Sequence, residues 1–184
     1  MAFNRKPRGN KSEFEETLLD IARVTRVVAG GKRLSFRATL VIGNKLKHQV
    51  GVGIGKGKDV AQAIQKASNK AKKNLIIVPI VNETILHEVK AKYKSAVVMI
   101  KPAKKGAGIR AGGAARTVLK LANVPNANAK ILSSSSNAIN NARVTILALS
   151  KLKNFVSTEK LNEKKLSDKK EQTKDYANSS DKIK

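Results

Sequence analysis

The chain has 184 residues, of which 41% are hydrophobic and only 3% aromatic, and it contains no cysteine and no tryptophan. This length suits one domain or two small ones with an aliphatic core, and the absence of cysteine excludes disulfides and thiolate metal sites. With 38 Lys and Arg against 13 Asp and Glu, the net charge of +25 predicts a polyanionic partner, because such a surface otherwise repels itself.

The two ends of the chain differ in composition from its middle. Residues 1–13 predict a flexible basic arm, and residues 154–184 predict a charged, disordered tail. The arm lacks the apolar stretch of a signal peptide, and no segment reaches the roughly 20 apolar residues of a membrane-spanning helix. We therefore expect a cytoplasmic protein with no membrane partner.

Between these ends, the pattern predicts an α+β protein with two units, residues 14–80 and 81–153. In the first unit, β-branched runs at 19–29 and 34–43 flank Gly30-Gly31-Lys32-Arg33 and predict a β-hairpin, and a third strand is expected from His48 to Gly55.

The third strand alternates aliphatic residues with glycines: Val50, Gly51, Val52, Gly53, Ile54 and Gly55. One of its faces is therefore bare backbone, which predicts an unusually close approach by another group. Asp59 is the expected N-cap of a helix that ends near Asn74. Its predicted apolar side consists of Val60, Ile64, Ala67 and Ala71. The order is thus β-β-β-α.

The second unit follows a seam at Pro79 and Asn82-Glu83 and mixes strands with helices. The predicted elements are strands at 85–92, 95–101 and 129–132, helices at 114–122 and 137–152, and a glycine-rich loop at 106–113.

Neither glycine-rich segment carries a complete nucleotide motif. The segment Gly51–Asp59 lacks the Walker spacing followed by Lys and Ser or Thr. Residues 106–111 fit the pattern G-x-G-x-x-A, but no Asp or Glu follows about 20 residues later to hold a ribose. For residues 106–111, glycines that permit a tight turn and close helix packing are the better interpretation, and nucleotide binding is the weaker alternative at both segments.

Residue types for catalysis are also missing. No carboxylate occurs from Val89 to Thr158, and His48 and His87 have no neighbour at ligand spacing. General acid–base and metal chemistry need such groups in convergent positions. We therefore expect no enzyme activity, no catalytic residue, no cofactor, no metal and no small-molecule substrate. A membrane-surface protein is disfavoured because the helices have alanine-rich stripes instead of large apolar anchors.

The remaining signal is positive charge on and beside the strands of the first unit. Lys56 and Lys58 precede a helix N-terminus, which favours an anion, so together they are expected to hold a phosphate. The scarcity of aromatic residues favours phosphate and 2′-hydroxyl contacts with folded RNA over base stacking. The predicted RNA-binding residues are Arg23, Arg26, Gly30, Gly31, Lys32, Arg33, Arg37, Lys45, Lys47, Gly51, Gly53, Gly55, Lys56 and Lys58.

Six segments resemble, in order, those of the family of small-subunit ribosomal protein five. They are Arg23–Phe36, Val50–Lys58, Ala63–Ala67, Lys101–Ala103, Gly106–Gly113 and Asn137–Asn140. The resemblance covers residues 14–152. It implies a domain like those that bind double-stranded RNA, followed by a βαβ-type domain.

For function, the resemblance implies binding to small-subunit ribosomal RNA and a role in translational accuracy near the decoding region. It also implies a position beside the path by which messenger RNA enters, with ribosomal proteins four and eight as neighbours. The loop Val28–Arg33 matches a loop beside the spectinomycin site, and Arg116 matches a position facing protein four. The alternative is a free-standing RNA-binding module or RNA chaperone.

The sequence departs from the family pattern at three places. Ala29 replaces a Lys in the loop, and Ala138 replaces a Pro. In the run Ser133–Ser136, Ser133 or Ser134 stands where the family has a Gly, and the run contains one extra residue. These changes bear on the charge of the loop and on the geometry before the last helix.

Overall fold

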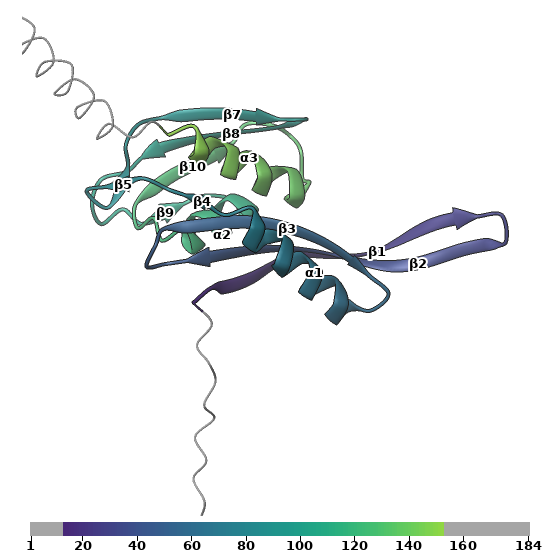
Figure 1. The fold of residues 1–184 in the computed structure, drawn as a ribbon. Coiled ribbons are helices and arrows are strands. Elements are labelled where there is room, and N and C mark those ends of the chain that lie inside the picture. Colours follow the sequence, from purple (N-terminus) through teal and green to yellow (C-terminus); the bar gives the residue numbers. More distant parts are fainter. Residues whose placement is uncertain (1–12, 153–184) are drawn as a thin grey trace, which may run out of the picture. The chain divides into compact units, whose positions relative to one another are not determined.

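The computed structural model describes residues 13–152, so the predictions for residues 1–12 and for the tail at 154–184 lie outside the described residues. The described part contains two four-stranded sheets, a two-stranded hairpin and three helices. The α+β class is confirmed (Figure 1).

The first sheet has the order β1-β2-β3-β4 and is antiparallel throughout. Its strands are β1 (Glu15–Val28), β2 (Gly31–Asn44), β3 (Gln49–Gly57) and β4 (Ile76–Ile77). The predicted hairpin is confirmed, but its turn consists of Ala29 and Gly30, and pairing already starts at Val28 opposite Gly31. Both strands are longer than predicted.

Helix α1 (Val60–Lys73) covers one face of this sheet, and Asp59 occupies the predicted N-cap position, although its side chain makes no capping hydrogen bond. The buried residues of α1 are Ala63, Ala67, Ser68 and Ala71. The predicted apolar side is correct at Ala67 and Ala71, and Ile64 packs half-buried against the same cluster, but the prediction omits Ala63. Small residues line the contact because α1 lies very close to the sheet.

The close approach predicted for β3 is made by α1 itself. A Cβ added to Gly51 would lie 2.6 Å from the carbonyl oxygen of Ala71, and one added to Gly53 would clash with the carbonyl oxygen of Ala67. All the glycines of β3 meet backbone atoms of α1 or its N-cap in this way. The glycine face of β3 is therefore the surface against which α1 packs.

A small hairpin, β5 (Ile80–Val81) and β6 (Thr84–Ile85), occupies the predicted seam. Its turn residues Asn82 and Glu83 both have positive φ, 51° and 63°, as a tight hairpin turn requires. The strand predicted at 85–92 is therefore divided. Its first residue belongs to this hairpin, and its end belongs to a different sheet.

The second sheet has the order β7-β8-β10-β9. Its strands are β7 (Val89–Tyr93), β8 (Ala96–Pro102), β9 (Ile109–Arg110) and β10 (Ala127–Ile131). Helix α2 (Gly113–Leu121) joins β9 to β10, and these two strands are parallel, which makes the expected βαβ unit. Strand β9 lies within the segment predicted as a glycine-rich loop.

Two glycines of that loop adopt the positive φ values that its turns require. Gly106 and Gly108 have φ values of 84° and 71°, which L side chains rarely adopt. No atom outside their immediate neighbours lies within 4 Å of a Cβ added to either residue, so they are not sites of close helix packing. The tight-turn part of the prediction is correct and the packing part is wrong.

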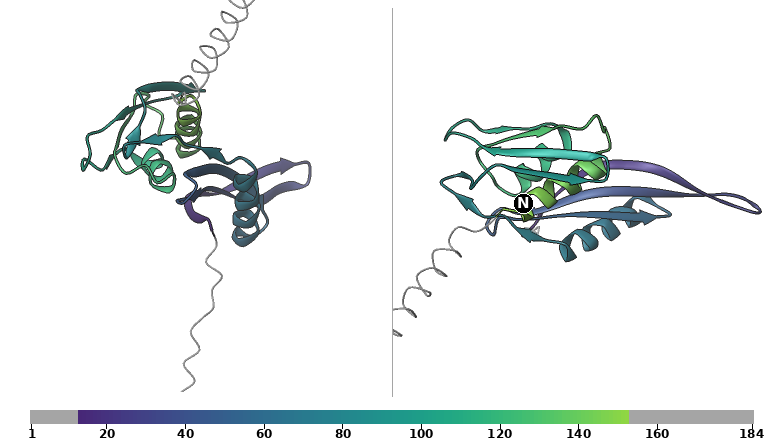
Figure 2. Two further views of the ribbon diagram at one scale, coloured as in Figure 1. Left: turned by 60° about the vertical axis from the view of Figure 1, so that its left-hand side comes forward. Right: turned by 90° about the horizontal axis from the view of Figure 1, so that it is seen from above.

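Helices α2 and α3 (Ala138–Ser150) lie between the two sheets, and α1 covers the far face of the first sheet (Figures 1 and 2). One hydrophobic cluster joins Val41 and Val50 of the first sheet to Val118 of α2 and Leu149 of α3. At Gly43, a Cβ would clash with the backbone of Leu121, so β2 and α2 are in direct contact. Residues 13–152 accordingly belong to one packed unit, and the predicted limits of its two domains stay predictions.

The last helix starts with a well-formed cap. Asn137 is its N-cap, and the side-chain oxygen accepts hydrogen bonds from the backbone N–H groups of Ile139 (3.0 Å) and Asn140 (3.3 Å). Ser133, in the serine run, accepts a hydrogen bond from the backbone N–H of Val97 (3.1 Å). The run thus connects β8 to the segment before α3.

Replacing Ala138 with Pro is expected to stabilise the protein by about 0.4–1 kcal/mol. Ala138 is the first residue of α3, where Pro is favourable, and Asn137 is extended (φ −67°, ψ 104°), as a residue before Pro must be. Urea unfolding of Ala138→Pro against the parent measures the difference. Ala142→Pro, inside α3, is the control and should destabilise by about 3 kcal/mol or more. A destabilised Ala138→Pro variant would contradict this prediction.

Candidate nucleic-acid interface

The outer part of the β1–β2 hairpin stands free of the rest of the sheet. Pairing between β2 and β3 ends at Phe36 opposite Gly57, whereas β1 and β2 stay paired to Val28 and Gly31. Residues 24–35 therefore form a two-stranded extension, called here the hairpin arm. Both views in Figure 2 show it projecting past α1.

A row of cations runs along one face of the arm and continues onto the adjoining part of the sheet. Residues directly opposite each other in an antiparallel pair point to the same face. Arg26 lies opposite Arg33, and Arg37 lies opposite Lys56. Since Arg26, Arg33, Arg37 and Lys56 share one face of the continuous sheet, we call them the arm cations.

The arm cations differ in how far their charge is compensated. A guanidinium nitrogen of Arg37 lies 3.5 Å from a carboxylate oxygen of Asp20, and both side chains are about one-third exposed. Within residues 13–152, neither Arg26 nor Arg33 forms an ion pair, and both are exposed. These two arginines are thus free to bind an anionic partner.

The opposite face of the arm, together with the neighbouring pair at its base, is mixed. Arg23 lies opposite Phe36, and Lys32 lies opposite Val27. Val27 is 73% exposed and Leu34 is 53% exposed. The predicted cations of the hairpin are therefore divided between a cationic face and a face that alternates cations with apolar side chains.

Lys56 and Lys58 lie at the base of the arm, just before α1. Both are exposed, and no acidic residue occurs in the first turn of the helix. Because the Asp59 side chain makes no cap, the first backbone N–H groups of α1 are not occupied by it. This end of α1 has the polarity expected of a phosphate-binding position.

The structure places Lys45 and Lys47 at the other end of the sheet, in the turn between β2 and β3. The ammonium of Lys45 lies 2.6 Å from a carboxylate oxygen of Glu15. The backbone oxygen of Lys45 accepts a hydrogen bond from the Asn123 side chain at 3.2 Å. Lys45 and Lys47 therefore belong to the junction with α2, separated from the arm tip by the full length of β2.

The predicted glycines have two different environments. Gly30 and Gly31 are exposed at the arm tip, and Gly31 has a φ of 129°. Gly51, Gly53 and Gly55 are buried beneath α1. Their assignment to RNA binding stays a prediction, and their contact within the described chain is with the helix.

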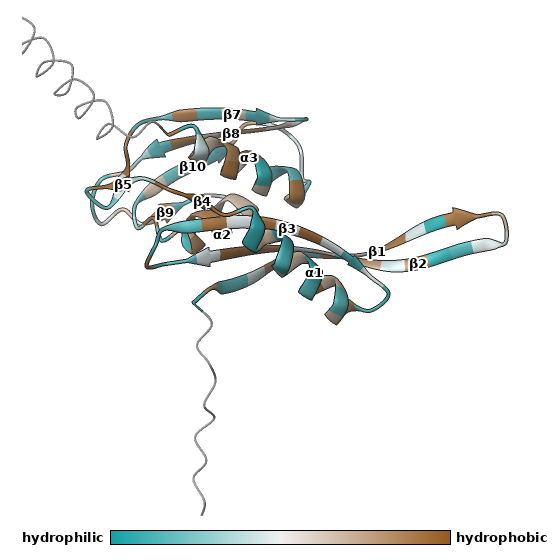
Figure 3. Cartoon of the chain, viewed as in Figure 1, coloured by the Kyte–Doolittle hydropathy of each residue, from teal (hydrophilic) through white to brown (hydrophobic). Residues whose placement is uncertain are grey.

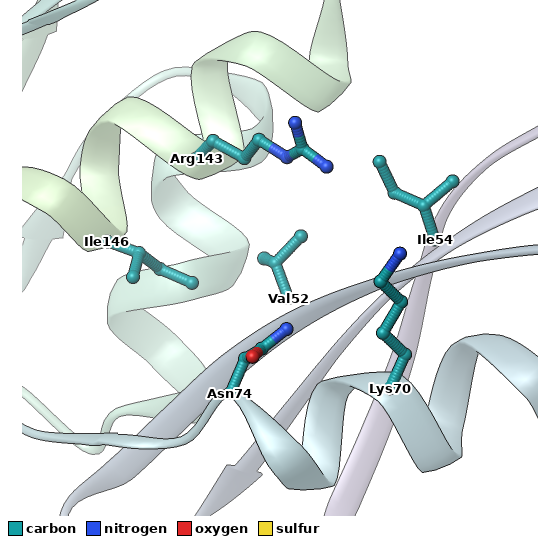
Figure 4. A pocket seen from close by; sticks show the side chains of 6 residues that line it. All are labelled: Val52, Ile54, Lys70, Asn74, Arg143 and Ile146. Carbon is teal, nitrogen blue, oxygen red and sulfur yellow. The ribbon is translucent and has the colours of Figure 1, made fainter.

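A pocket of about 250 Å³ lies where β3, α1 and α3 meet (Figure 4). Its lining residues are Val52, Ile54, Lys70, Asn74, Arg143 and Ile146. Arg143 donates a hydrogen bond to the hydroxyl of Tyr93 (2.8 Å), and its guanidinium lies 5.7 Å from the centre of that ring. The pocket combines an apolar floor with two cations from different domains and no carboxylate.

No sequence signal links Lys70 to Arg143. The lysines on the outer side of α1 follow a helical spacing, but the contribution of α3 arises from packing between the two domains. A second pocket, of about 640 Å³, lies between β9, β10 and the start of α2. Arg116 lines it and is exposed, and its predicted contact with a partner protein stays a prediction.

Within residues 13–152, no group of three or more His, Asp or Glu side chains is placed to hold a metal ion. None of the helices in the same range is long and apolar enough to cross a membrane.

Comparison with known proteins identifies relatives along most of the chain. A family model described as ribosomal protein S5, N-terminal domain, matches residues 14–79, and one described as ribosomal protein S5, C-terminal domain, matches residues 91–162. The small ribosomal subunit protein uS5 of Picosynechococcus sp. is 48% identical over 161 residues, covering 85% of this chain and 92% of that protein.

Two other relatives agree with this assignment. The small ribosomal subunit protein uS5 of Campylobacter jejuni is 45% identical over 144 residues, covering 78% of this chain and 97% of that protein. The uS5c protein of Spinacia oleracea is 50% identical over 143 residues, covering 77% of this chain but only 46% of that longer protein. With both domain models matched in order and the two bacterial relatives covered over more than nine-tenths or nearly nine-tenths of their length, the chain belongs to the ribosomal protein S5 family.

Proposed function

We propose that this protein is a structural constituent of the small ribosomal subunit and holds folded ribosomal RNA in place. The observation that carries the proposal is the cationic face of the hairpin arm, where Arg26 and Arg33 lie side by side without an ion pair to residues 13–152. A two-stranded hairpin is only marginally stable alone in water. Binding to a polyanion would add the stabilising contacts that the arm does not receive from the rest of the sheet. The names of the relatives, small ribosomal subunit proteins, support the same role.

The chemistry of binding follows from the residues at the surface. Lys and Arg neutralise phosphates and release condensed counterions, while exposed backbone at the arm tip permits a close approach. The cation pair at the α1–α3 pocket adds a position for one phosphate at the junction of the two domains. Gly51, Gly53 and Gly55 act indirectly in this proposal, because they set the position of α1 and of the lysines before it.

Within the subunit, we place the protein near the decoding region and the path by which messenger RNA enters, where it supports translational accuracy. Its neighbours are ribosomal proteins four and eight, with Arg116 facing protein four. Sedimentation of cell extracts through a sucrose gradient tests this assignment. The protein should migrate with small subunits and stay bound in high salt, whereas a free-standing RNA-binding module would be released to the top of the gradient.

Binding to free small-subunit RNA is expected to depend steeply on salt. If the protein makes roughly 6–10 phosphate contacts, its affinity falls about 10³- to 10⁵-fold between 50 and 200 mM salt. Filter binding or fluorescence anisotropy at several salt concentrations measures the slope. A flat salt response would contradict charge neutralisation as the source of affinity.

A further inference from the structure

The outer face of the second sheet is a cationic surface that the proposed function leaves unused. Helices α2 and α3 pack on its inner face, where Ala91, Val98 and Ile100 are buried. The strands alternate strictly, so Lys90 and Lys92 point to the other side and are exposed. We call the side of the sheet away from α2 and α3 the outer face.

Every strand of the sheet contributes at least one cation to the outer face. These cations are Lys90 and Lys92 of β7, Lys101 of β8, Lys130 of β10 and Arg110 of β9. Their common orientation follows from the register. Lys90 and Lys130 flank Met99 in one row across three strands. Lys101 and Arg110 flank Asn128 in the next row. Figure 3 shows the hydrophilic and hydrophobic residues alternating along β7.

The charge on the outer face is almost uncompensated. Glu88 is the one carboxylate within 4 Å of these cations among the described residues, and it lies 3.3 Å from the ammonium of Lys101. No Asp or Glu follows it until Glu159. Cations gathered on one face repel each other, so the arrangement favours a polyanion that neutralises several of them together.

The residue types favour RNA over a protein partner. Lysines are depleted at protein–protein interfaces, whose binding energy comes mainly from buried aromatic and arginine anchors. Four of the five outer-face cations are lysines, and the apolar side chains between them, Val97 and Met99, are already half-buried. With no aromatic platform for stacking on this face, the contacts open to it are with phosphates and 2′-hydroxyls.

We propose that the outer face of the second sheet is a separate RNA-contact surface that binds the phosphate backbone of structured RNA. This inference rests on the proposed function, because it assumes that the protein is bound to ribosomal RNA. It extends that function by assigning the second domain its own RNA contact, remote in sequence from the hairpin arm.

The absence of cysteine makes a direct test possible, because any introduced thiol is unique in the chain. Lys92→Cys, carrying a tethered iron chelate that generates hydroxyl radicals, should cut nearby RNA in reconstituted small subunits. Arg33→Cys, labelled in the same way on the hairpin arm, should cut the RNA at different positions. Unlabelled variants assembled in parallel give the background.

The outcomes separate the two proposals. Cuts from both positions support both. Cuts from Arg33→Cys alone overturn the outer face as an RNA surface and leave the proposed function in place. If a photo-crosslinker at Lys92→Cys captures a protein instead of RNA, the face is a protein interface and the inference is wrong. If neither position gives cuts in particles that contain the protein, the proposed function is overturned as well.

Binding measurements give an independent readout. Lys90→Gln/Lys92→Gln should weaken binding to small-subunit RNA about 10- to 100-fold and lower the logarithmic salt slope by about 1.8. The control is Lys104→Gln/Lys105→Gln, which removes the same charge from the exposed loop after β8. If both pairs weaken binding equally, the effect is one of net charge, and the outer face has no special role.

Discussion

Gly53→Ala is expected to lower the free energy of unfolding by about 3 kcal/mol. The added Cβ would clash with the carbonyl oxygen of Ala67 and lie 2.7 Å from the backbone nitrogen of Ala71. Both atoms belong to the backbone of α1, so no side chain can rotate away. Either the helix moves off the sheet or the strand bends.

Urea unfolding followed by circular dichroism measures this loss. Gly30→Ala is the matched control, since no atom outside its immediate neighbours lies within 4 Å of the added Cβ and its φ is not in the left-handed region. The control should keep the stability of the parent or gain a few tenths of a kcal/mol. Equal stability of Gly53→Ala and the parent would show that α1 does not sit on β3 as closely as described.

Arg26→Gln/Arg33→Gln is expected to weaken binding to small-subunit RNA about 10- to 100-fold and to lower the logarithmic salt slope by about 1.8. The two arginines lie opposite each other on the cationic face of the arm and have no ion pair with residues 13–152. Because like charges directly opposite destabilise a strand pair, the same variant should be more stable in the free state by roughly 0.2–1 kcal/mol. Binding and stability therefore change in opposite directions.

The other face of the arm provides the comparison. Arg23→Gln/Lys32→Gln removes the same charge, but these cations alternate with exposed apolar side chains and do not lie opposite each other. We expect a smaller loss of affinity and no gain in stability. Equal losses from the two pairs, measured by anisotropy at one salt concentration, would mean that RNA does not distinguish the faces.

The turns and helix starts that depend on neighbouring residues were predicted well from the sequence. Gly30 between two β-branched runs indicated the first hairpin, and Asp59 before a lysine-rich helical period indicated the start of α1. Asn137 likewise marked the start of α3, and its side chain makes the capping hydrogen bonds. These features depend on residues close in sequence, so pattern and capping preferences reveal them.

The register of the hairpin was harder to predict from the sequence. A four-residue turn at Gly30–Arg33 would place Arg26 opposite Arg37, whereas the two-residue turn Ala29–Gly30 places Arg26 opposite Arg33. Shifting the turn changes every cross-strand pair, although the pattern of apolar residues is nearly unchanged. The composition of the cationic face was therefore predictable, but the pairing of its arginines was not.

The sequence by itself determined that this chain is a cationic α+β protein of the S5 family, because charge, glycine spacing and motif order are properties of the linear chain. Only the tertiary structure decided that the glycines of β3 pack against α1, that Lys70 and Arg143 line the same pocket, and that cations of four strands share the outer face. These facts depend on packing and register between segments far apart in the chain, on which local preferences have no influence.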